Sequence, residues 1–229
     1  MEINGLQKLT LLDFPGKVAC TAFLAGCDMR CPFCHNSELW SEKAPAVMDD
    51  NEFISFLEKR RGMLDGVALT GGEPTLRAEL PSLLSRIKAL GFAVKLDSNG
   101  LHPEALDKLI GEKLVDYIAM DVKNDPARYG ETCGRKDMDI SPILESIALL
   151  KEGRVGYEFR TTVVRELHDD ASFLGIGEMI TGAERYFLQP FVDRDTVLFA
   201  GFTAPSAEDM QRYLGIVAPF VGHAEIRGA

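Results

Sequence analysis

The most constraining feature of this sequence is a regular alternation of two kinds of segment along its 229 residues. Short runs rich in apolar and β-branched residues, typical of buried strands, alternate with longer stretches that have helical periodicity. The expected strands are residues 18–24, 67–70, 93–97, 117–122, 157–164 and 186–188. The expected helices are residues 51–61, 78–90, 103–112, 141–152, 169–181 and 206–220. This alternation predicts an α/β fold of right-handed βαβ units around a parallel sheet, either doubly wound or curled into a full or partial barrel.

The two ends of the chain add smaller features. Pro15 and Gly16 stand in tandem between two apolar runs, in the order that a type II turn favours, so we expect a short hairpin before the first barrel strand. Residues 223–227 are expected to form one last short strand. Because no repeat, low-complexity tract or linker interrupts the sequence, a single domain over residues 1–229 is the simplest interpretation.

Composition argues against several classes of function. The chain has 35 acidic and 25 basic residues and a formal net charge of −10, which works against a phosphate-binding surface, so we expect no nucleic-acid partner. No run approaches the roughly 18 to 20 apolar residues that a bilayer span needs, and the start of the chain lacks the pattern of a signal peptide. We therefore expect a soluble cytoplasmic protein with no membrane partner.

Three of the five cysteines lie within eight residues, directly after the first expected strand. Cys27, Cys31 and Cys34 have the spacing C-x-x-x-C-x-x-C, which suits metal ligation in a reducing compartment better than a disulfide framework. Three thiolates can hold three irons of a cubane [4Fe-4S] cluster and leave the fourth iron open to a substrate. Cys20 is most simply a small buried hydrophobe, and Cys133 lies in a loop near the presumed site. We assign neither to the cluster, because the three closely spaced thiolates already form the expected set.

Two other metal centres match parts of this pattern. A structural zinc site also uses cysteines spaced two or three apart, and His35 is then a candidate fourth ligand. Residues 31–35 also satisfy the covalent haem pattern C-x-x-C-H, but haem attachment by that route is expected with an export signal, which the sequence lacks. Zinc therefore stays open as an alternative, whereas the missing export signal argues against haem.

Further polar residues stand where the other expected strands end, which is the edge at which α/β barrels place their active sites. Each has an ordinary explanation when taken alone, such as a tight turn, a helix N-cap or a structural ion pair. Arg160 lies inside an apolar strand, where a charge is costly unless it is paired. Together with Arg160, the candidates are the strand-end residues Gly71, Gly72, Glu73, Pro74, Asp97, Ser98, Asp121, Lys123 and Gln189.

The cysteine run, with the aromatic Phe33 before its third cysteine, resembles the signature of the radical S-adenosylmethionine (SAM) superfamily. The segment Gly71-Gly72-Glu73-Pro74 at the next strand end strengthens the resemblance, since a segment of this kind contacts the methionine amino group of SAM in that superfamily. The resemblance implies a [4Fe-4S] cluster on the three cysteines, SAM as cofactor, and a partial parallel (β/α)6 barrel with a short N-terminal hairpin.

Within the superfamily, the sequence is similar over nearly its whole length to the enzymes that activate glycyl-radical enzymes. Residues 6–16 and the run Cys34-His35-Asn36 favour the activating proteins of anaerobic ribonucleoside-triphosphate reductase. This resemblance implies that Arg160 faces the SAM carboxylate and that Gln189 stands near the place of a histidine in formate-lyase activating enzymes, so that contact is either kept by an amide or lost. The other residues that it implies at the SAM site are Asn36, Asp97, Ser98, Asp121 and Lys123.

A monovalent cation also belongs to what the resemblance implies. Activating enzymes hold such a cation near the SAM carboxylate, which makes Asp97 and Asp121 its candidate ligands here. The residues by themselves do not call for it, because a carboxylate at a strand end is equally an N-cap or part of a solvated loop.

The implied activity is that of a radical SAM oxidoreductase. One electron from a flavodoxin-like donor enters the cluster, SAM is cleaved, and the 5′-deoxyadenosyl radical removes a hydrogen from a glycine of the partner enzyme. No residue of the chain need act as a general acid or base, because the cofactor carries the difficult chemistry. Three alternatives remain: an activating enzyme of the formate-lyase type, a small-molecule radical SAM enzyme resembling 7-carboxy-7-deazaguanine synthase, and a non-enzymatic zinc or electron-transfer module.

Overall fold

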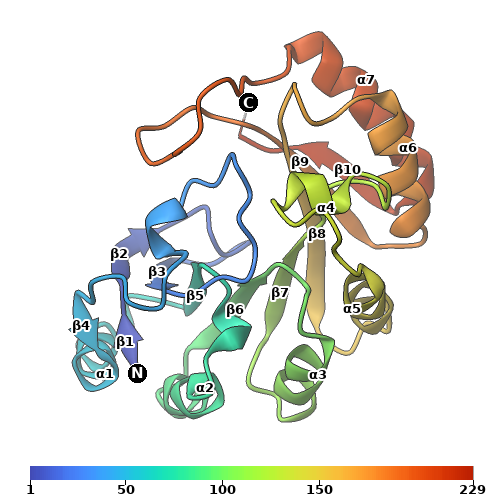
Figure 1. The fold of residues 1–229 in the computed structure, drawn as a ribbon. Helices are drawn as coiled ribbons and strands as arrows, with labels where there is room; N and C mark the ends of the chain where they lie inside the picture. The colour runs from blue at the N-terminus through green and yellow to red at the C-terminus, as the bar shows by residue number, and fades with distance from the viewer. Residues whose placement is uncertain (229) are drawn as a thin grey trace.

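The structure is a computed structural model and describes residues 1–228. One sheet of eight strands runs through it in the order β10-β9-β8-β7-β6-β5-β3-β2 (Figure 1). Neighbouring strands are parallel throughout, except for the antiparallel pair β2 and β3. The parallel strands are β3 (Ala19–Leu24), β5 (Gly66–Gly71), β6 (Ala93–Ser98), β7 (Tyr117–Asp121), β8 (Gly156–Val163), β9 (Arg185–Pro190) and β10 (His223–Ile226).

This sheet confirms the α/β class and the open order of a partial barrel. All six expected barrel strands are present and parallel. The short last strand expected at residues 223–227 is present as β10, which pairs parallel with β9 and extends the six-stranded barrel by one strand. Within residues 1–228 no pairing joins β10 to β2, so the two edges of the sheet are not closed on each other.

Helices connect the parallel strands, and all six expected helices are present. Several have strong start signals in the sequence, such as the capping box that Asp49 and Glu52 form at the start of α1. The helices are α1 (Asp50–Glu58), α2 (Leu80–Ala89), α3 (Pro103–Gly111), α5 (Ser141–Lys151), α6 (Asp170–Met179) and α7 (Ala207–Val217). Single 3-10 turns occur at Ser37–Leu39, Pro74–Leu76 and Ala218–Phe220. In this described part of the chain no helix is long and apolar enough to cross a membrane.

The N-terminal hairpin is present, with a difference in its second strand. Strand β2 (Gly5–Thr10) pairs antiparallel with β3, so the first barrel strand is itself half of the hairpin rather than its successor. The turn between them has the predicted chemistry, because the Lys17 N–H donates to the Phe14 carbonyl at 3.1 Å and Gly16 has φ +69°.

Three short elements were not predicted. They are α4 (Tyr129–Thr132) and the two-residue strands β1 (Glu2–Ile3) and β4 (Met48–Asp49), which pair with each other. Elements of two to four residues are too short to produce a periodic pattern, so sequence reasoning has no signal for them.

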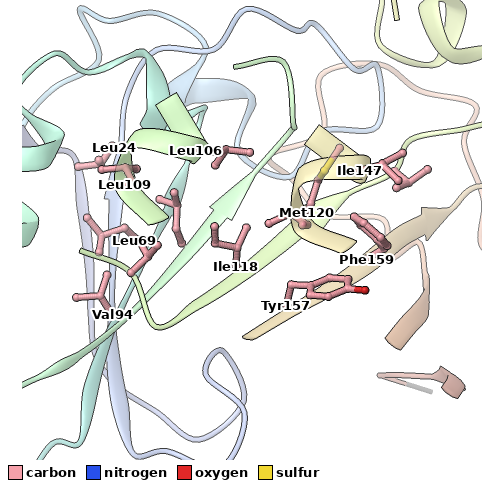
Figure 2. Close-up of a cluster of buried hydrophobic side chains, with 14 of the residues drawn as sticks. Leu24, Leu69, Val94, Leu106, Leu109, Ile118, Met120, Ile147, Tyr157 and Phe159 are labelled. Carbon is pink, nitrogen blue, oxygen red and sulfur yellow. The ribbon is translucent and has the colours of Figure 1, made fainter. Parts of the chain in front are cut away.

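The hydrophobic core lies between the sheet and the helices that cover one of its faces. Figure 2 shows buried side chains of the strands from β3 to β8, among them Leu69 and Ile118, packed beside those of α3 and α5. The residues in this layer include Val94, Ile118, Phe159, Leu106, Leu109 and Ile147, all at most 3% exposed. Because side chains alternate along a strand, the intervening residues point to the opposite face. That face, which we call the inner face, carries Lys95, Asp97, Asp121 and Arg160.

Candidate active site at the carboxyl ends of the strands

A cavity of about 260 Å³ lies at the carboxyl ends of the parallel strands. The loop after β3 forms one wall and the ends of β5 to β9 form the rest, as expected for an α/β site. Of the residues singled out in the sequence, those that line it are Cys27, Cys31, Phe33, Cys34, Asn36, Gly71, Gly72, Asp97, Ser98, Asp121, Lys123, Arg160 and Gln189. Glu73 and Pro74 are the two that are not on the cavity wall.

Several wall residues escaped the sequence analysis. They are Met29, Trp40, Thr70, Asn99 and Thr162, and also His35, which the sequence marks only as a candidate zinc or haem ligand and as part of the run of residues 34–36. Strand alternation was an available signal for Thr162, because it follows Arg160 by two residues in β8 and therefore shares its face.

The loop after β3 brings the three cysteines to the cavity wall. Cys31 is buried, whereas Cys27 and Cys34 are partly exposed. Cys27 Sγ accepts a hydrogen bond from the Met29 N–H, and Cys34 Sγ accepts one from the Asn36 N–H, each at 3.4 Å. Burial raises the pKa of Cys27 to about 12 and also raises that of Cys34, so both thiols hold their protons until a metal centre displaces them.

A fourth cysteine, Cys133, lies against Cys31 although a hundred residues separate them. Cys133 is fully buried at the end of α4, and its carbonyl accepts a hydrogen bond from the Arg30 N–H at 2.9 Å. A hydrogen bond from the Cys133 thiol lowers the pKa of Cys31 and raises that of Cys133. Cys20 is buried within β3, where burial raises its pKa to about 12, in keeping with the behaviour of a small hydrophobe.

The paired glycines are required by the packing of two backbones. A Cβ at Gly72 would lie 2.1 Å from the Gly26 carbonyl oxygen, and a Cβ at Gly71 would lie 2.4 Å from the Leu24 carbonyl oxygen. Gly71 also has φ +120°, which side-chain-bearing residues rarely adopt. The Gly72 N–H donates to Leu24 at 2.8 Å, and the Glu73 N–H donates to Gly26 at 2.7 Å. These contacts fix the glycine segment against the start of the cysteine loop.

Glu73 is buried behind the cavity wall and joins two of its loops. Its Oε1 accepts hydrogen bonds from the Thr75 N–H at 3.1 Å and the Ser98 hydroxyl at 3.1 Å, and its Oε2 accepts one from the Asn99 N–H at 2.6 Å. Burial outweighs these bonds and raises the pKa of Glu73. Asn36 ties the cysteine loop to the same region, because its Nδ2 donates to the Gly71 carbonyl at 3.1 Å.

Five charged side chains form a connected network on the inner face. Lys95 pairs with Asp97 Oδ1, and Arg160 Nη2 lies 3.1 Å from Asp97 Oδ2. Arg160 Nε donates to Asp121 Oδ1 at 2.5 Å, and Lys123 Nζ donates to Asp121 Oδ2 at 2.7 Å. The charge inside strand β8 is therefore paired, and three positive charges against two negative ones leave a net attraction for an anion such as a carboxylate.

The pKa values of this network follow from its ion pairs. Burial opposes ionisation of Asp121, but the charges of Arg160 and Lys123 outweigh burial and hold its pKa well below the usual range. The same balance, with Arg160 and Lys95 as partners, lowers the pKa of Asp97. For Arg160 and Lys123, burial favours the neutral form, and the neighbouring carboxylates outweigh it and raise both pKa values.

His35 is held by the segment that follows β9. Its Nε2 is 2.7 Å from the Val192 carbonyl oxygen, its ring stacks on Phe191 with 5.5 Å between ring centres, and burial lowers its pKa. For residues 1–228, no group of three His, Cys, Asp or Glu side chains surrounds a point where a single metal ion would sit. Thiolates of a cubane cluster bind different irons, so they need not converge on one point.

Comparison with known proteins assigns the chain to a family. The sequence profile of the radical SAM superfamily matches residues 21–171, which include the cysteine loop, the paired glycines and Arg160. The chain belongs to the radical SAM superfamily. Membership implies a [4Fe-4S] cluster and SAM as cofactors, and it favours the cluster over the zinc alternative for the three cysteines.

Three curated relatives illustrate the range of similarity. A Methanocaldococcus jannaschii protein named glycyl-radical enzyme activating enzyme is 32% identical over 233 residues, which cover 98% of this chain and 95% of the relative. A Streptococcus mutans pyruvate formate-lyase-activating enzyme is 31% identical over 152 residues, covering 60% of this chain and 57% of the relative. A Hyperthermus butylicus 7-carboxy-7-deazaguanine synthase is 37% identical over 91 residues, covering 39% of this chain and 38% of the relative.

Solved structures agree on the fold. A domain of a pyruvate-formate lyase-activating enzyme from Bacteroides vulgatus superimposes with a TM-score of 0.58 at 24% identity, covering 71% of this chain and 99% of that domain. Streptococcus suis SuiB bound to SAM superimposes with a TM-score of 0.69 at 13% identity, covering 89% of this chain and 48% of SuiB. These likenesses support the radical SAM fold of the chain.

The residues of the cavity fit the cluster and SAM, and they fit a monovalent cation less well. Three thiols share one wall, and the cationic network across the cavity suits a ligand carboxylate. In contrast, both oxygens of Asp97 and both oxygens of Asp121 already contact a lysine or an arginine, so these expected cation ligands are engaged.

Proposed function

We propose that this chain activates a glycyl-radical enzyme, and that its partner is an anaerobic ribonucleoside-triphosphate reductase. The observation that carries the proposal is one cavity with two complementary walls. Three thiols lie on a single loop, and the wall formed by the strand ends carries a network with net positive charge, which suits the carboxylate of a ligand. The relative named as a glycyl-radical enzyme activating enzyme supports it further, since the similarity extends over nearly the whole of both chains.

In this proposal each wall of the cavity has its own task. Cys27, Cys31 and Cys34 hold the cluster, which with SAM supplies the one-electron cleavage of a carbon–sulfur bond. Arg160 and Lys123 bind the SAM carboxylate through charge-assisted hydrogen bonds. The backbone at residues 71–72 and the side chains of Phe33, Asn36, Ser98 and Gln189 shape the rest of the SAM site.

Glu73 has a positioning task in the proposal. Its carboxylate fixes the position of the loop after β5 relative to the loop after β6, and both loops contribute to the cavity wall. A site held by buried hydrogen bonds keeps its geometry when the ligand arrives, so less of the binding free energy goes into ordering it.

Two other candidate functions have observations in their favour. The similarity to formate-lyase activating enzymes supports a different glycyl-radical partner. The similarity to 7-carboxy-7-deazaguanine synthase supports turnover of a small molecule without a protein partner, although it covers a smaller part of this chain.

The partner is tested by electron paramagnetic resonance under anaerobic conditions. The reconstituted chain, SAM and a reductant are incubated separately with an anaerobic reductase, with a formate lyase and with no protein partner. We expect a glycyl radical signal on the reductase. A signal on the formate lyase alone identifies the formate-lyase type, and SAM cleavage without any protein radical favours the small-molecule function. Replacing the reductant by a reduced flavodoxin then tests the expected electron donor.

A further inference from the structure

We propose that Lys95 supplies, from within the protein, the positive charge that a monovalent cation supplies beside the SAM carboxylate in the activating enzymes that this chain resembles. The SAM site of this chain then needs neither K⁺ nor Na⁺. The inference rests on the proposed function to the extent that SAM provides the carboxylate.

The position of Lys95 is unusual for a lysine. It lies in the middle of β6 and its side chain is only 2% exposed. Lysines are almost never fully buried unless they are paired, and Lys95 is paired with Asp97 two residues further along the same strand. Since residues two apart in a strand share a face, the ammonium group lies on the inner face, directly below the cavity wall formed by Asp97.

The carboxylate oxygens that a metal ion would need are already engaged. Asp97 contacts Lys95 through Oδ1 and Arg160 through Oδ2, at 3.1 Å for the second. Asp121 contacts Arg160 through Oδ1 at 2.5 Å and Lys123 through Oδ2 at 2.7 Å. A K⁺ or Na⁺ ion bound to any of these oxygens would have to share it with an ammonium or guanidinium group, whose positive charge repels the ion at this distance.

The charges of the network also argue against a bound K⁺ or Na⁺ ion. The network holds three positive and two negative side chains, and the carboxylate of SAM brings a third negative charge, so these six groups balance one another without a metal ion. The next charged residue on this face, Glu158, has its own partner, because Arg227 donates to its two oxygens at 2.7 and 3.0 Å. An added K⁺ or Na⁺ would leave an excess positive charge in a buried network, which is costly.

The first test compares SAM cleavage with and without alkali cations. The reductant is titanium(III) citrate prepared with Tris base, SAM is its tosylate salt, and the only added cation is K⁺, Na⁺ or tetramethylammonium. We expect 5′-deoxyadenosine formation by the wild-type chain to differ by less than about twofold among the three conditions, whereas a fall of about tenfold without K⁺ and Na⁺ would overturn the inference. The wild-type comparison decides this even where a variant does not fold.

The second test removes the built-in charge. In Lys95→Gln, we expect cleavage to fall about tenfold in tetramethylammonium and to recover when K⁺ or Na⁺ is added, because the freed Asp97 can then accept a cation. The control variant Lys108→Gln loses a positive charge from the exposed side of α3 and should behave as the wild type. A Lys95→Gln chain that cleaves SAM at the wild-type rate in every buffer would contradict the proposal. A loss that neither K⁺ nor Na⁺ reverses would also contradict it, since a purely structural lysine gives no cation-dependent rescue.

A direct measurement separates this inference from the proposed function. Broadening of the sodium-23 resonance is recorded for the wild type and for Lys95→Gln in the absence of iron and SAM, with K⁺ as competitor. We expect competable Na⁺ binding by Lys95→Gln and none by the wild type. If the wild type cleaves SAM in no buffer, the proposed function is rejected, and Na⁺ binding still decides about Lys95. If the wild type binds Na⁺ that K⁺ displaces, the inference about Lys95 is rejected.

Discussion

Glu73 Oε2 accepts a hydrogen bond from the backbone N–H of Asn99 at 2.6 Å, which joins the loop after β5 to the loop after β6. The donor is a backbone amide and the carboxylate is fully buried, so no solvent replaces the bond when it is lost. The two loops therefore depend on one side chain that does not itself reach the cavity.

Substitution Glu73→Gln tests this link. A glutamine amide group cannot accept every bond that the carboxylate accepts, so at least one buried donor loses its partner. We expect the free energy of unfolding to fall by about 1–3 kcal/mol, measured by urea denaturation under anaerobic conditions. Glu79→Gln, at an exposed position before α2, is the control and should be neutral. Equal stability of the wild type and Glu73→Gln would show that this bond does not hold the loops.

Substitution Gly72→Ala tests the close approach of the two backbones. The added Cβ would lie 2.1 Å from the Gly26 carbonyl oxygen, so the glycine segment and the cysteine loop must move apart. We expect a loss of stability of about 1–3 kcal/mol and weaker retention of iron after reconstitution. Gly215→Ala, in α7 with open space around the new Cβ, should leave both quantities unchanged or slightly raise stability. Iron retention by Gly72→Ala at the wild-type level would show that the close packing of Gly72 is not needed for the cysteine loop to hold the cluster.

The cysteine assignments are tested by iron and sulfide analysis after anaerobic reconstitution. We expect Cys27→Ala, Cys31→Ala and Cys34→Ala each to lose the cluster, because each removes one of three iron ligands. Cys133→Ala is the matched control, since Cys133 is buried against Cys31 and yet belongs to no ligand set in our account. A Cys133→Ala chain that cannot retain iron would contradict this assignment and place Cys133 among the iron ligands.

Arg160→Met should affect both stability and SAM binding. Arg160 bridges Asp97 and Asp121, and its removal leaves two mostly buried carboxylates with fewer counter-charges. We expect a loss of about 3–5 kcal/mol in the free energy of unfolding, together with weaker SAM binding by equilibrium dialysis. Arg154→Met breaks an exposed pair with Asp107 and should change neither. Tight SAM binding by a folded Arg160→Met chain would exclude Arg160 from the carboxylate site.

The stability of the chain should depend on pH through His168. His168 is buried, Nε2 lies 2.9 Å from the Lys123 carbonyl oxygen, and burial lowers the pKa of the ring in the folded state. An unfolded histidine takes up its proton below about pH 6.5 while the folded one does so only at lower pH, so this contribution to stability is present above about pH 6.5 and is lost as pH falls. The difference in the free energy of unfolding between the wild type and His168→Gln should therefore shrink on acidification. A difference that grows on acidification would contradict this pH dependence.

The parallel sheet could be predicted because each of its first six strands is a run of apolar residues followed by a helical pattern. Those signals are local, so the elements were identified within a few residues of their ends. The partner of β2 could not be deduced in the same way, because strand pairing depends on contacts between segments rather than on either segment alone.

The candidate site could be predicted where its residues stand at strand ends. Asp97 and Asp121 were identified by that criterion and Arg160 as a charge inside an apolar strand, and the structure brings the three into one network. Lys95 was overlooked because it stands inside an apolar run, although alternation already placed it on the face of Asp97. Cys133 had no such signal, since its contact with Cys31 arises only when α4 packs against the cysteine loop.

The most direct test of the account is the formation of 5′-deoxyadenosine by the anaerobically reconstituted chain with SAM and a strong reductant, measured beside Cys31→Ala. The account predicts cleavage by the wild type and none by the variant, because the cluster on the three cysteines delivers the electron. Absence of cleavage by a wild-type chain that retains its iron, or equal cleavage by Cys31→Ala, would contradict it.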